Sequence, residues 1–418
     1  MAHLEGIYIK TTLDNTSIDQ NLLNIANKNK SNPLPWNGQF SPQLVQILLN
    51  NYAPKNAIVF DPFSGSGTTL LESGELGLEC YGTEINPAAI YISKIYLFIN
   101  IKIPERVLLL NQFENILIKS NLIYNSGLFE VVNNHSTKET FKNLLATITN
   151  NYEKILFEAL IIFTDFYKND FSPTWIEKQW NRIKNIVKSL PYSEKEISVI
   201  HADARDTGFS DSKFNFVITS PPYINVFNYH QQFRSSTEHL YGSILPVSHS
   251  EIGSNRKNRG NRFLTVIQYC LDMSQVFNEL KRITQKGSRF IVIMGRESSV
   301  RKTSFYNGEI VAEIAYKACD LPLIKRQERV FVNKYGTHIY EDILHFENNK
   351  QFVSESIDIS RGISKSILLS VENEVKLEVT DDLKNALSLI HKVEPSPKLN
   401  RINSMESYND TIAKTAWR

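Results

Sequence analysis

The sequence predicts an α/β protein built on a doubly wound sheet, and a stretch near the N-terminus is the first reason. Residues 58–61 (Ile-Val-Phe-Asp) are a short apolar run typical of a buried strand; a turn of small residues follows at 64–67, and a helical pattern begins at Thr69. Strand, glycine-rich turn and helix in this order are typical of a nucleotide-binding site. Two further predicted strands end on Glu84 and Asp203, at the sheet edge where such folds bind ligands.

The turn itself leaves several interpretations open. Gly65 and Gly67 have no Cβ, so the turn can be tight and a ligand can lie against its backbone. A phosphate-binding P-loop would need a lysine after the last glycine, where this chain has Thr68. The dinucleotide fingerprint is matched only by its first two glycines, and a purely structural turn also fits.

Composition indicates a packed globular protein. The 418 residues are 42% apolar and 22% charged, enough for one large domain and a second region. The net charge of +2 neither requires nor excludes a nucleic-acid partner. Cys80, Cys270 and Cys319 are isolated, so we expect no metal site or disulfide framework, and a reducing cytoplasm fits. We expect no signal peptide and no membrane partner, because no apolar run is long enough to span a bilayer.

The glycine turn is flanked by a proline-rich loop and followed by a long helical region. Ser41 and Pro42 predict a helix start, and apolar residues continue that helix through Leu49. Residues 97–196 interrupt the α/β pattern and predict helices over 141–168 and 175–190. The second helix is basic, which indicates either a solvated face or a face turned toward DNA.

A second notable stretch is Ser220-Pro221-Pro222-Tyr223. It follows a predicted strand over 214–219, which must stop because proline cannot continue a central ladder. Alone, these four residues also fit an ordinary turn or a proline-rich ligand. A strand over 288–294, and a hairpin of 328–332 with 343–346, complete the predicted sheet.

Together, Asp-Pro-Phe-Ser-Gly-Ser-Gly-Thr-Thr at 61–69 and Ser-Pro-Pro-Tyr at 220–223 resemble the motifs of S-adenosylmethionine-dependent DNA amino-methyltransferases. The resemblance implies a seven-stranded mixed sheet of the class I methyltransferase, Rossmann-like type. The methyltransferase domain would comprise residues 32–96 and 197–349, with a helical insertion over 97–196 as a candidate target-recognition region. Residues 350–418 would form a C-terminal appendage without an assigned role.

The resemblance implies S-adenosyl-L-methionine as the cofactor. Glu84, about 20 residues beyond the glycine turn, suits the ribose hydroxyls. The family resemblance implies that Asp203 hydrogen-bonds the adenine amine of the cofactor. Trp36 and Phe40 are expected either to hold the methionine half or to pack in the core. The remaining cofactor residues implied are those of the turn: Asp61, Pro62, Phe63, Gly65, Ser66, Gly67 and Thr68.

Catalysis is expected at residues 220–223. The Ser220 side chain and the Pro221 carbonyl would accept hydrogen bonds from an exocyclic base amine, while the prolines hold this geometry. Tyr223 would stack on a base that has left the duplex. The absence of a cysteine at this loop argues against methylation of cytosine C5. The predicted partner is double-stranded DNA, held in part by the basic loop Arg256, Lys257, Arg259 and Arg262; a cognate restriction or defence system is a further expected partner.

The first residue of the catalytic motif favours cytosine N4 as the methylated atom, because Ser220 is the form typical of those members. Adenine N6 is the second candidate, since many N4 members place the catalytic motif first and here the cofactor motif comes first. Guanine N2 of RNA is a third. A non-catalytic cofactor- or DNA-binding regulatory subunit is the alternative of another class.

Overall fold

The computed structural model describes residues 6–123, 134–224, 228–254, 258–333 and 335–399. Its main sheet has seven strands in the order β3-β2-β1-β4-β5-β9-β8. Neighbouring strands are parallel from β3 to β5, and β9 is antiparallel to both β5 and β8. This confirms the predicted doubly wound, seven-stranded mixed sheet. The strands are β1 Ile58–Asp61, β2 Glu79–Glu84, β3 Ile197–His201, β4 Phe214–Thr219, β5 Thr284–Gly295, β8 Leu323–Val332 and β9 His338–Glu347.

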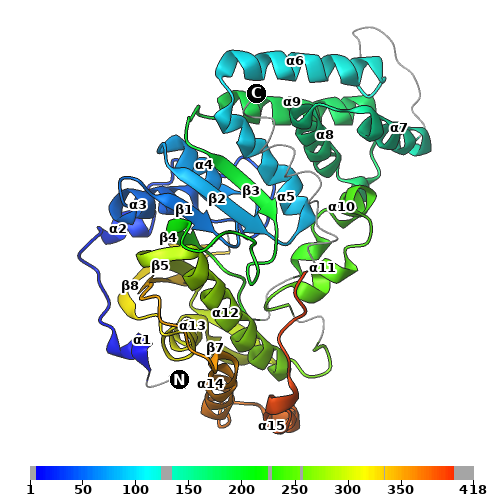
Figure 1. Ribbon diagram of the computed structural model, residues 1–418. Coiled ribbons are helices and arrows are strands. Elements are labelled where there is room, and N and C mark those ends of the chain that lie inside the picture. The colour runs from blue at the N-terminus through cyan, green and yellow to red at the C-terminus, as the bar shows by residue number, and fades with distance from the viewer. Residues whose placement is uncertain (1–5, 124–133, 225–227, 255–257, 334, 400–418) are drawn as a thin grey trace.

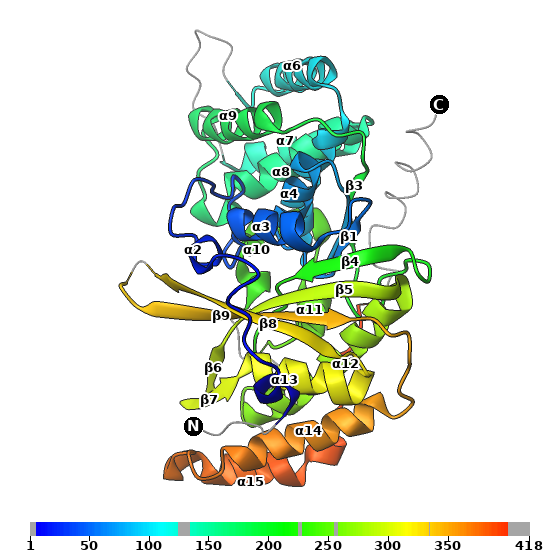
Figure 2. The same ribbon diagram turned by 90° about the vertical axis from the view of Figure 1, so that its left-hand side faces the viewer.

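Helices cover both faces of the sheet. Successive side chains of a strand point to opposite faces, so Val59 lies in one buried apolar cluster and Phe60 in the other. The first face carries α3 Pro42–Tyr52, α4 Thr68–Glu75 and α5 Pro87–Ser93; the second carries α12 Phe263–Ile283, α13 Asn307–Glu313 and α14 Ser356–Ser370 (Figures 1 and 2). Ser41 is the residue before α3, as predicted.

The inserted segment is helical and stacks beyond α5, farthest from α12 (Figure 1). It contains α6 Ile103–Lys119, α7 Asn134–Thr147, α8 Asn151–Thr164 and α9 Pro173–Ser189. The single helix predicted over 141–168 is wrong, because Asn150 interrupts it and caps α8 by accepting from the N–H groups of Tyr152 and Glu153. The basic side chains of α9 are partly used within the protein. Lys184 pairs with Glu114 at 2.7 Å, Lys178 lies over the Trp175 ring and Arg182 lies over Phe163.

Lys286 and Gly287 have the sequence pattern of a helix end, but in the structure they lie within a strand. α12 ends at Ile283, and β5 begins directly at Thr284. Gly287 has a φ of 79° inside β5, where the pairing with β4 is irregular between Phe214 and Phe216, and its N–H donates to the Asn348 carbonyl at 2.7 Å. Gly287 therefore lies at an irregularity in a strand. In the sequence, a glycine in this role looks the same as a glycine that ends a helix.

Several smaller elements frame the carboxyl edge of the sheet. The short helices α1 Ile7–Lys10 and α2 Gln20–Leu23 lie along β8, and α10 Arg234–Tyr241 and α11 Leu245–Ser250 follow the residue 220–223 loop. β6 Glu297–Val300 and β7 Thr303–Tyr306 form a separate hairpin after β5. α15 Thr380–Ser388 packs on α12, and the chain then returns toward α11 (Figure 1). Among the described residues, no helix combines the length and apolar character needed to cross a bilayer.

Candidate active site

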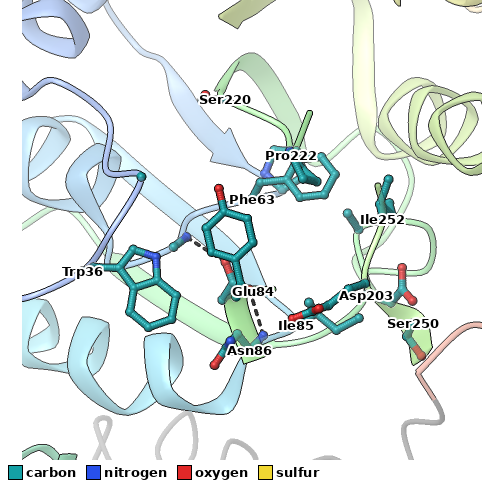
Figure 3. Close-up of a pocket in the computed structure, with 16 residues that line it drawn as sticks. Trp36, Phe63, Glu84, Ile85, Asn86, Asp203, Ser220, Pro222, Ser250 and Ile252 are labelled. Atoms are coloured by element: carbon teal, nitrogen blue, oxygen red, sulfur yellow. Dashed lines mark hydrogen bonds between the residues drawn. The ribbon is translucent and has the colours of Figure 1, made fainter. Parts of the chain in front are cut away.

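A cleft opens at the carboxyl ends of β1, β2, β3 and β4, and its volume is about 710 Å³ including the space at its mouth. In Figure 3, Trp36 and Ile252 lie on opposite sides of this cleft, with Glu84 between them. The Trp36 and Tyr229 rings are nearly parallel, with an interplanar angle of 11° and centroids 6.4 Å apart. The mixed polar and apolar lining is typical of a small-molecule site.

The glycine turn has a backbone conformation that requires its two glycines. Gly65 and Gly67 have φ values of 51° and 87°, in the region that disfavours other residues. A Cβ on Gly67 would also lie 2.8 Å from the Tyr96 ring. The Ser64 N–H donates to the Thr83 carbonyl at 3.0 Å, which ties the turn to the end of β2. The turn is therefore held open beside the acidic residue that ends β2.

Asp61 lies behind the turn and does not line the cleft. Its carboxylate accepts from the hydroxyls of Thr69 at 2.6 Å and Thr219 at 2.7 Å, and from the Phe63 N–H at 3.1 Å. These bonds join the ends of β1 and β4 to α4. Burial raises the pKa of Asp61 to about 6, against the opposing effect of the three hydrogen bonds. In the structure, Asp61 joins the two loops by hydrogen bonds, and its predicted contact with the cofactor stays a prediction.

Glu84 is the acidic side chain at the floor of the cleft. Its two carboxylate oxygens accept from the N–H groups of Gly65 at 2.9 Å and Asn86 at 2.8 Å (Figure 3). Burial raises the pKa of Glu84 to about 7, although these N–H groups favour the ionised form. Each oxygen keeps acceptor capacity for a second donor. A ligand with two adjacent hydroxyls fits this carboxylate.

Asp203 lines the cleft, but its carboxylate is already engaged. One oxygen accepts from the N–H and Nε of Arg205, both at 2.9 Å; the other accepts from Arg205 Nη2 at 2.6 Å and from the Leu399 N–H at 3.1 Å. Burial would raise the pKa of Asp203, but the hydrogen bonds and charge of Arg205 hold it below its ordinary value. An adenine amine would reach this carboxylate by replacing one of these donors, and the Leu399 N–H makes the longest of the four bonds.

The loop 220–223 forms the opposite wall of the cleft. Ser220 and Pro222 line it, whereas Pro221 is buried. Two glycines hold Tyr223: a Cβ on Gly295 would lie 2.9 Å from its ring, and one on Gly253 would lie 2.4 Å from its carbonyl oxygen. Burial, first of all, raises the pKa of Tyr223, so this phenol stays neutral at physiological pH. The structure thus brings the loop and the glycine turn to one cleft.

Not every predicted cofactor residue lines the cleft. Those that do are Trp36, Pro62, Phe63, Gly65, Glu84 and Asp203. The others support the turn from behind: the Phe40 carbonyl accepts from Asn32, Ser66 accepts from Gln39 at 2.7 Å, and Thr68 donates to Asn32 at 2.8 Å. Cleft residues missed by the sequence reasoning are Gly38, Ile85, Asn86, Ala204, Tyr229, Ser250, Glu251 and Ile252. Ile85, Asn86 and Ala204 adjoin the acidic strand ends and could have been found from them.

The basic loop before α12 is only partly described, because Arg256 and Lys257 lie outside the described residues. Arg259 is exposed and Arg262 is half-buried. The loop continues from the cleft wall at residues 250–252, and its Gly260 carbonyl accepts from Arg301 in the turn between β6 and β7. The loop therefore runs from the cleft toward α12.

Comparison with known protein families gives two overlapping matches. Residues 7–95 match a model described as DNA methylase (N6_N4_Mtase), and residues 79–275 match the Eco57I restriction-modification methylase model. These matches support a DNA methyltransferase. Glu84 lies in both matched ranges and the loop 220–223 lies in the second, whereas β8, β9 and the C-terminal helices lie outside both.

Individual relatives are similar over short segments. The chain is 40% identical over 63 residues to the Type II methyltransferase M.MjaII of Methanocaldococcus jannaschii, and 45% identical over 56 residues to the Type II methyltransferase M.MvaI of Kocuria varians. These segments are 15% and 13% of this chain, and the chain spans only 12% of the length of each relative. A solved SAM-dependent methyltransferase of Methanosarcina mazei aligns with 72% of this chain and 96% of its own, at 11% identity and a TM-score of 0.32.

Proposed function

We propose that this protein transfers a methyl group from S-adenosyl-L-methionine to the exocyclic amine of a base in double-stranded DNA. One observation carries the proposal: Ser220 and Pro222 line the same cleft as Gly65 and Glu84. A ligand held by Glu84 and a base held at Ser220 would therefore meet in one space. The DNA methylase and restriction-modification methylase matches support this function and a cognate restriction enzyme as a partner.

The cleft fits the nucleoside part of the cofactor. The Glu84 carboxylate would accept from both ribose hydroxyls, while Ile85, Ala204 and Ile252 offer apolar surface to a planar ring. Trp36 lies over the turn, with its indole nitrogen 3.6 Å from where a Gly65 Cβ would be, and would pack against the methionine half. When bound, the cofactor supplies an electrophilic methyl group on its sulfonium.

The loop 220–223 would act on the base amine. That amine is a poor nucleophile because its lone pair is conjugated with the ring. Hydrogen bonds from the amine to the Ser220 hydroxyl and the Pro221 carbonyl would localise the lone pair toward the methyl group, and the rigid prolines need little reorganisation to accept them. Tyr223 would stack on the extruded base, a contact worth about 1–3 kcal/mol. We propose cytosine N4 as the methylated atom, because the short Ser220 side chain leaves room near the amine for a pyrimidine seated deep in the pocket.

The identity of the product tests the proposal. Duplex DNA treated with the purified protein and S-adenosylmethionine is digested to nucleosides and analysed by mass spectrometry. N4-methylcytosine is expected; N6-methyladenine alone would contradict the choice of base but retain the reaction type. A folded protein that binds no cofactor in calorimetry would contradict the enzyme, and binding of cofactor without a methylated product would favour a regulatory subunit.

Ser220→Ala should lower the methyl-transfer rate about 10- to 100-fold and leave cofactor affinity within about twofold, because one of two acceptors is lost and neither touches the cofactor. Single-turnover rates and calorimetry measure the two quantities. An unchanged rate would show that Ser220 does not contact the amine.

Gly295→Ala should displace the Tyr223 ring without reaching the cofactor. The new Cβ would lie 2.9 Å from that ring, so the stacking surface must shift by several tenths of an ångström. We expect kcat/KM for DNA to fall about tenfold, a loss of ~1.4 kcal/mol in transition-state stabilisation. Gly362→Ala is the matched control, because nothing lies within 4 Å of its Cβ position in α14. Equal activity of both variants would contradict a role for the Tyr223 ring.

A further inference from the structure

The β8–β9 hairpin reaches past the sheet that supports it. The ladder between β5 and β9 ends with Gly295 and Glu341, and one more bond runs from the Arg296 N–H to the Tyr340 carbonyl at 2.9 Å, whereas β8 and β9 remain paired out to Val332 and His338. Figure 2 shows the hairpin projecting from the sheet on the same side as β6 and β7. From Glu341 to the tip at Gly336 is five residues, or about 17 Å of extended strand.

The N-terminal segment covers the outer edge of β8 only part of the way. Leu13 pairs with Arg326, Gln20 donates to the Glu328 carbonyl at 3.0 Å, and the Asn24 side chain accepts from the Val330 N–H at 2.8 Å. An exposed strand edge is a liability that proteins usually cover. The cover ends near Val330, where the projecting part of the hairpin begins.

Hydrogen bonds join the described residues on the two sides of the hairpin tip, and residue 334 between them lies outside the described residues. The Asn333 N–H donates to the Thr337 carbonyl at 2.9 Å, and the Asn333 side chain accepts from the N–H groups of Tyr335 and Thr337. Gly336 takes a φ of 80°, which completes the turn. These bonds hold Asn333, Tyr335 and Thr337 in place relative to one another.

The projecting part carries exposed aromatic and polar side chains. Tyr335 is 78% exposed, Val332 is 57% exposed and Tyr340 is 44% exposed. His338 is exposed as well, and the sequence has no acidic residue between Arg329 and Glu341. Exposed aromatic side chains on a projecting strand pair are typical of a surface that contacts a partner.

The base of the hairpin lies beside the catalytic loop. Glu341 pairs with Arg329 at 2.6 Å, and its charge contributes to the raised pKa of Tyr223. Tyr223 in turn packs on Gly295, the residue paired with Glu341. A base entering the cleft at Ser220 and Pro222, which adjoin Tyr223, would therefore bring the neighbouring duplex close to the hairpin.

We propose that the β8–β9 hairpin enters the major groove of the DNA beside the extruded base and contacts base edges through Tyr335 and His338. This rests on the proposed function. The major groove is about 12 Å wide and admits a two-stranded ribbon, whereas the minor groove is about 6 Å wide and does not. A reach of about 17 Å corresponds to about five base pairs at 3.4 Å each, so the hairpin reads sequence on one side of the target.

Tyr335→Ala tests the proposal on the full chain. We expect the Kd for a duplex containing the methylation site, measured by fluorescence anisotropy, to rise about tenfold, with an unchanged slope of log Kd against log salt because Tyr335 contacts bases and not phosphates. Tyr316→Ala is the matched control. This tyrosine is 43% exposed and lies in the helical turn Ile314–Ala318, which packs on α12, α13 and α14, so its loss should leave the Kd unchanged.

Photo-crosslinking locates the contact. Duplexes with 5-iodouracil at single positions should crosslink to wild type at about five base pairs from the target and not to Tyr335→Ala. A Kd equal to that of wild type, or a loss of self-association in ultracentrifugation with DNA binding intact, would overturn the proposal; the latter would assign the hairpin to a second copy. Methyl transfer is measured on the same samples, so a protein that binds duplex through the hairpin but transfers no methyl group refutes the proposed function alone.

Discussion

Replacing Glu84 with glutamine should weaken S-adenosylmethionine binding about 100-fold, a loss of ~2.7 kcal/mol, because two charge-assisted hydrogen bonds to the ribose lose their acceptor charge. The amide would also turn an NH₂ group toward the N–H of Gly65 or Asn86, which now donate to the carboxylate. Calorimetry measures the affinity, and circular dichroism checks that the variant is folded.

The same residue should make binding depend on pH. The pKa of Glu84 in the free protein is about 7, and only the ionised form accepts from both hydroxyls. Protonation therefore competes with the ligand, and the Kd of the wild type should rise about tenfold for each pH unit below 7. Adenosine is the sharper probe, because it carries the ribose without an ionisable amino-acid group.

Two variants test whether the titration of Glu84, and not of another group, causes the pH dependence of binding. Glu84→Gln should bind adenosine with a Kd that is flat between pH 6 and 8. Asp61→Asn should keep the wild-type slope but move it to lower pH, because Asp61 lies behind the turn and its charge contributes to the raised pKa of Glu84. A Glu84→Gln protein that retains the pH dependence would show that another group titrates in the site.

How far the sequence predicted this site depends on how local each signal is. The glycine turn and the loop 220–223 are each encoded by a few consecutive residues, and parallel strands necessarily bring their carboxyl ends to one edge. Both were placed correctly at strand ends. Glu84 was predicted by its spacing from the turn, and the structure shows it hydrogen-bonded to the Gly65 N–H.

Long-range contacts were not predicted for the opposite reason. Tyr229 and residues 250–252 reach the cleft only because α10 and α11 fold back between them, and no local pattern indicates that path. The periodicity of apolar residues predicted one continuous helix over 141–168, whereas Asn150 caps the start of a second helix, α8. The return of the C-terminal chain to Arg205 joins residues 191 positions apart, so the sequence of one segment does not predict its contact with the other.

Replacing Arg205 with methionine should destabilise the protein by about 3–5 kcal/mol, since removing one partner of a buried ion pair leaves the other charge uncompensated. The Arg205 side chain is fully buried and binds Asp203 at 2.6 Å and Asp272 at 2.9 Å. It also donates to the carbonyls of Ser396 at 2.7 Å and Pro397 at 3.0 Å. Chemical denaturation measures the loss, with Arg234→Met as the control, because its exposed pair with Glu238 is worth about 0.3–0.5 kcal/mol.

The pH dependence identifies the cause. Without Arg205, the two aspartates would have folded-state pKa values above those of the unfolded chain, so the folded variant would bind protons more tightly and lose stability as pH rises. The destabilisation relative to wild type should therefore be smaller at pH 5 than at pH 8. Equal losses at both values would attribute the effect to packing instead of charge.

The same variant should release the C-terminal segment from the cleft. Ser396 and Leu399 would keep only their bonds to Asp272 and Asp203, whose orientation Arg205 now fixes. Trypsin should then cut after Lys392 or Lys398 at denaturant concentrations where wild type resists, because cleavage needs the backbone to leave its partners. Resistance equal to that of wild type would show that α14 and α15 hold the segment without Arg205, and that the Asp203 side of the cleft is independent of the C-terminal chain.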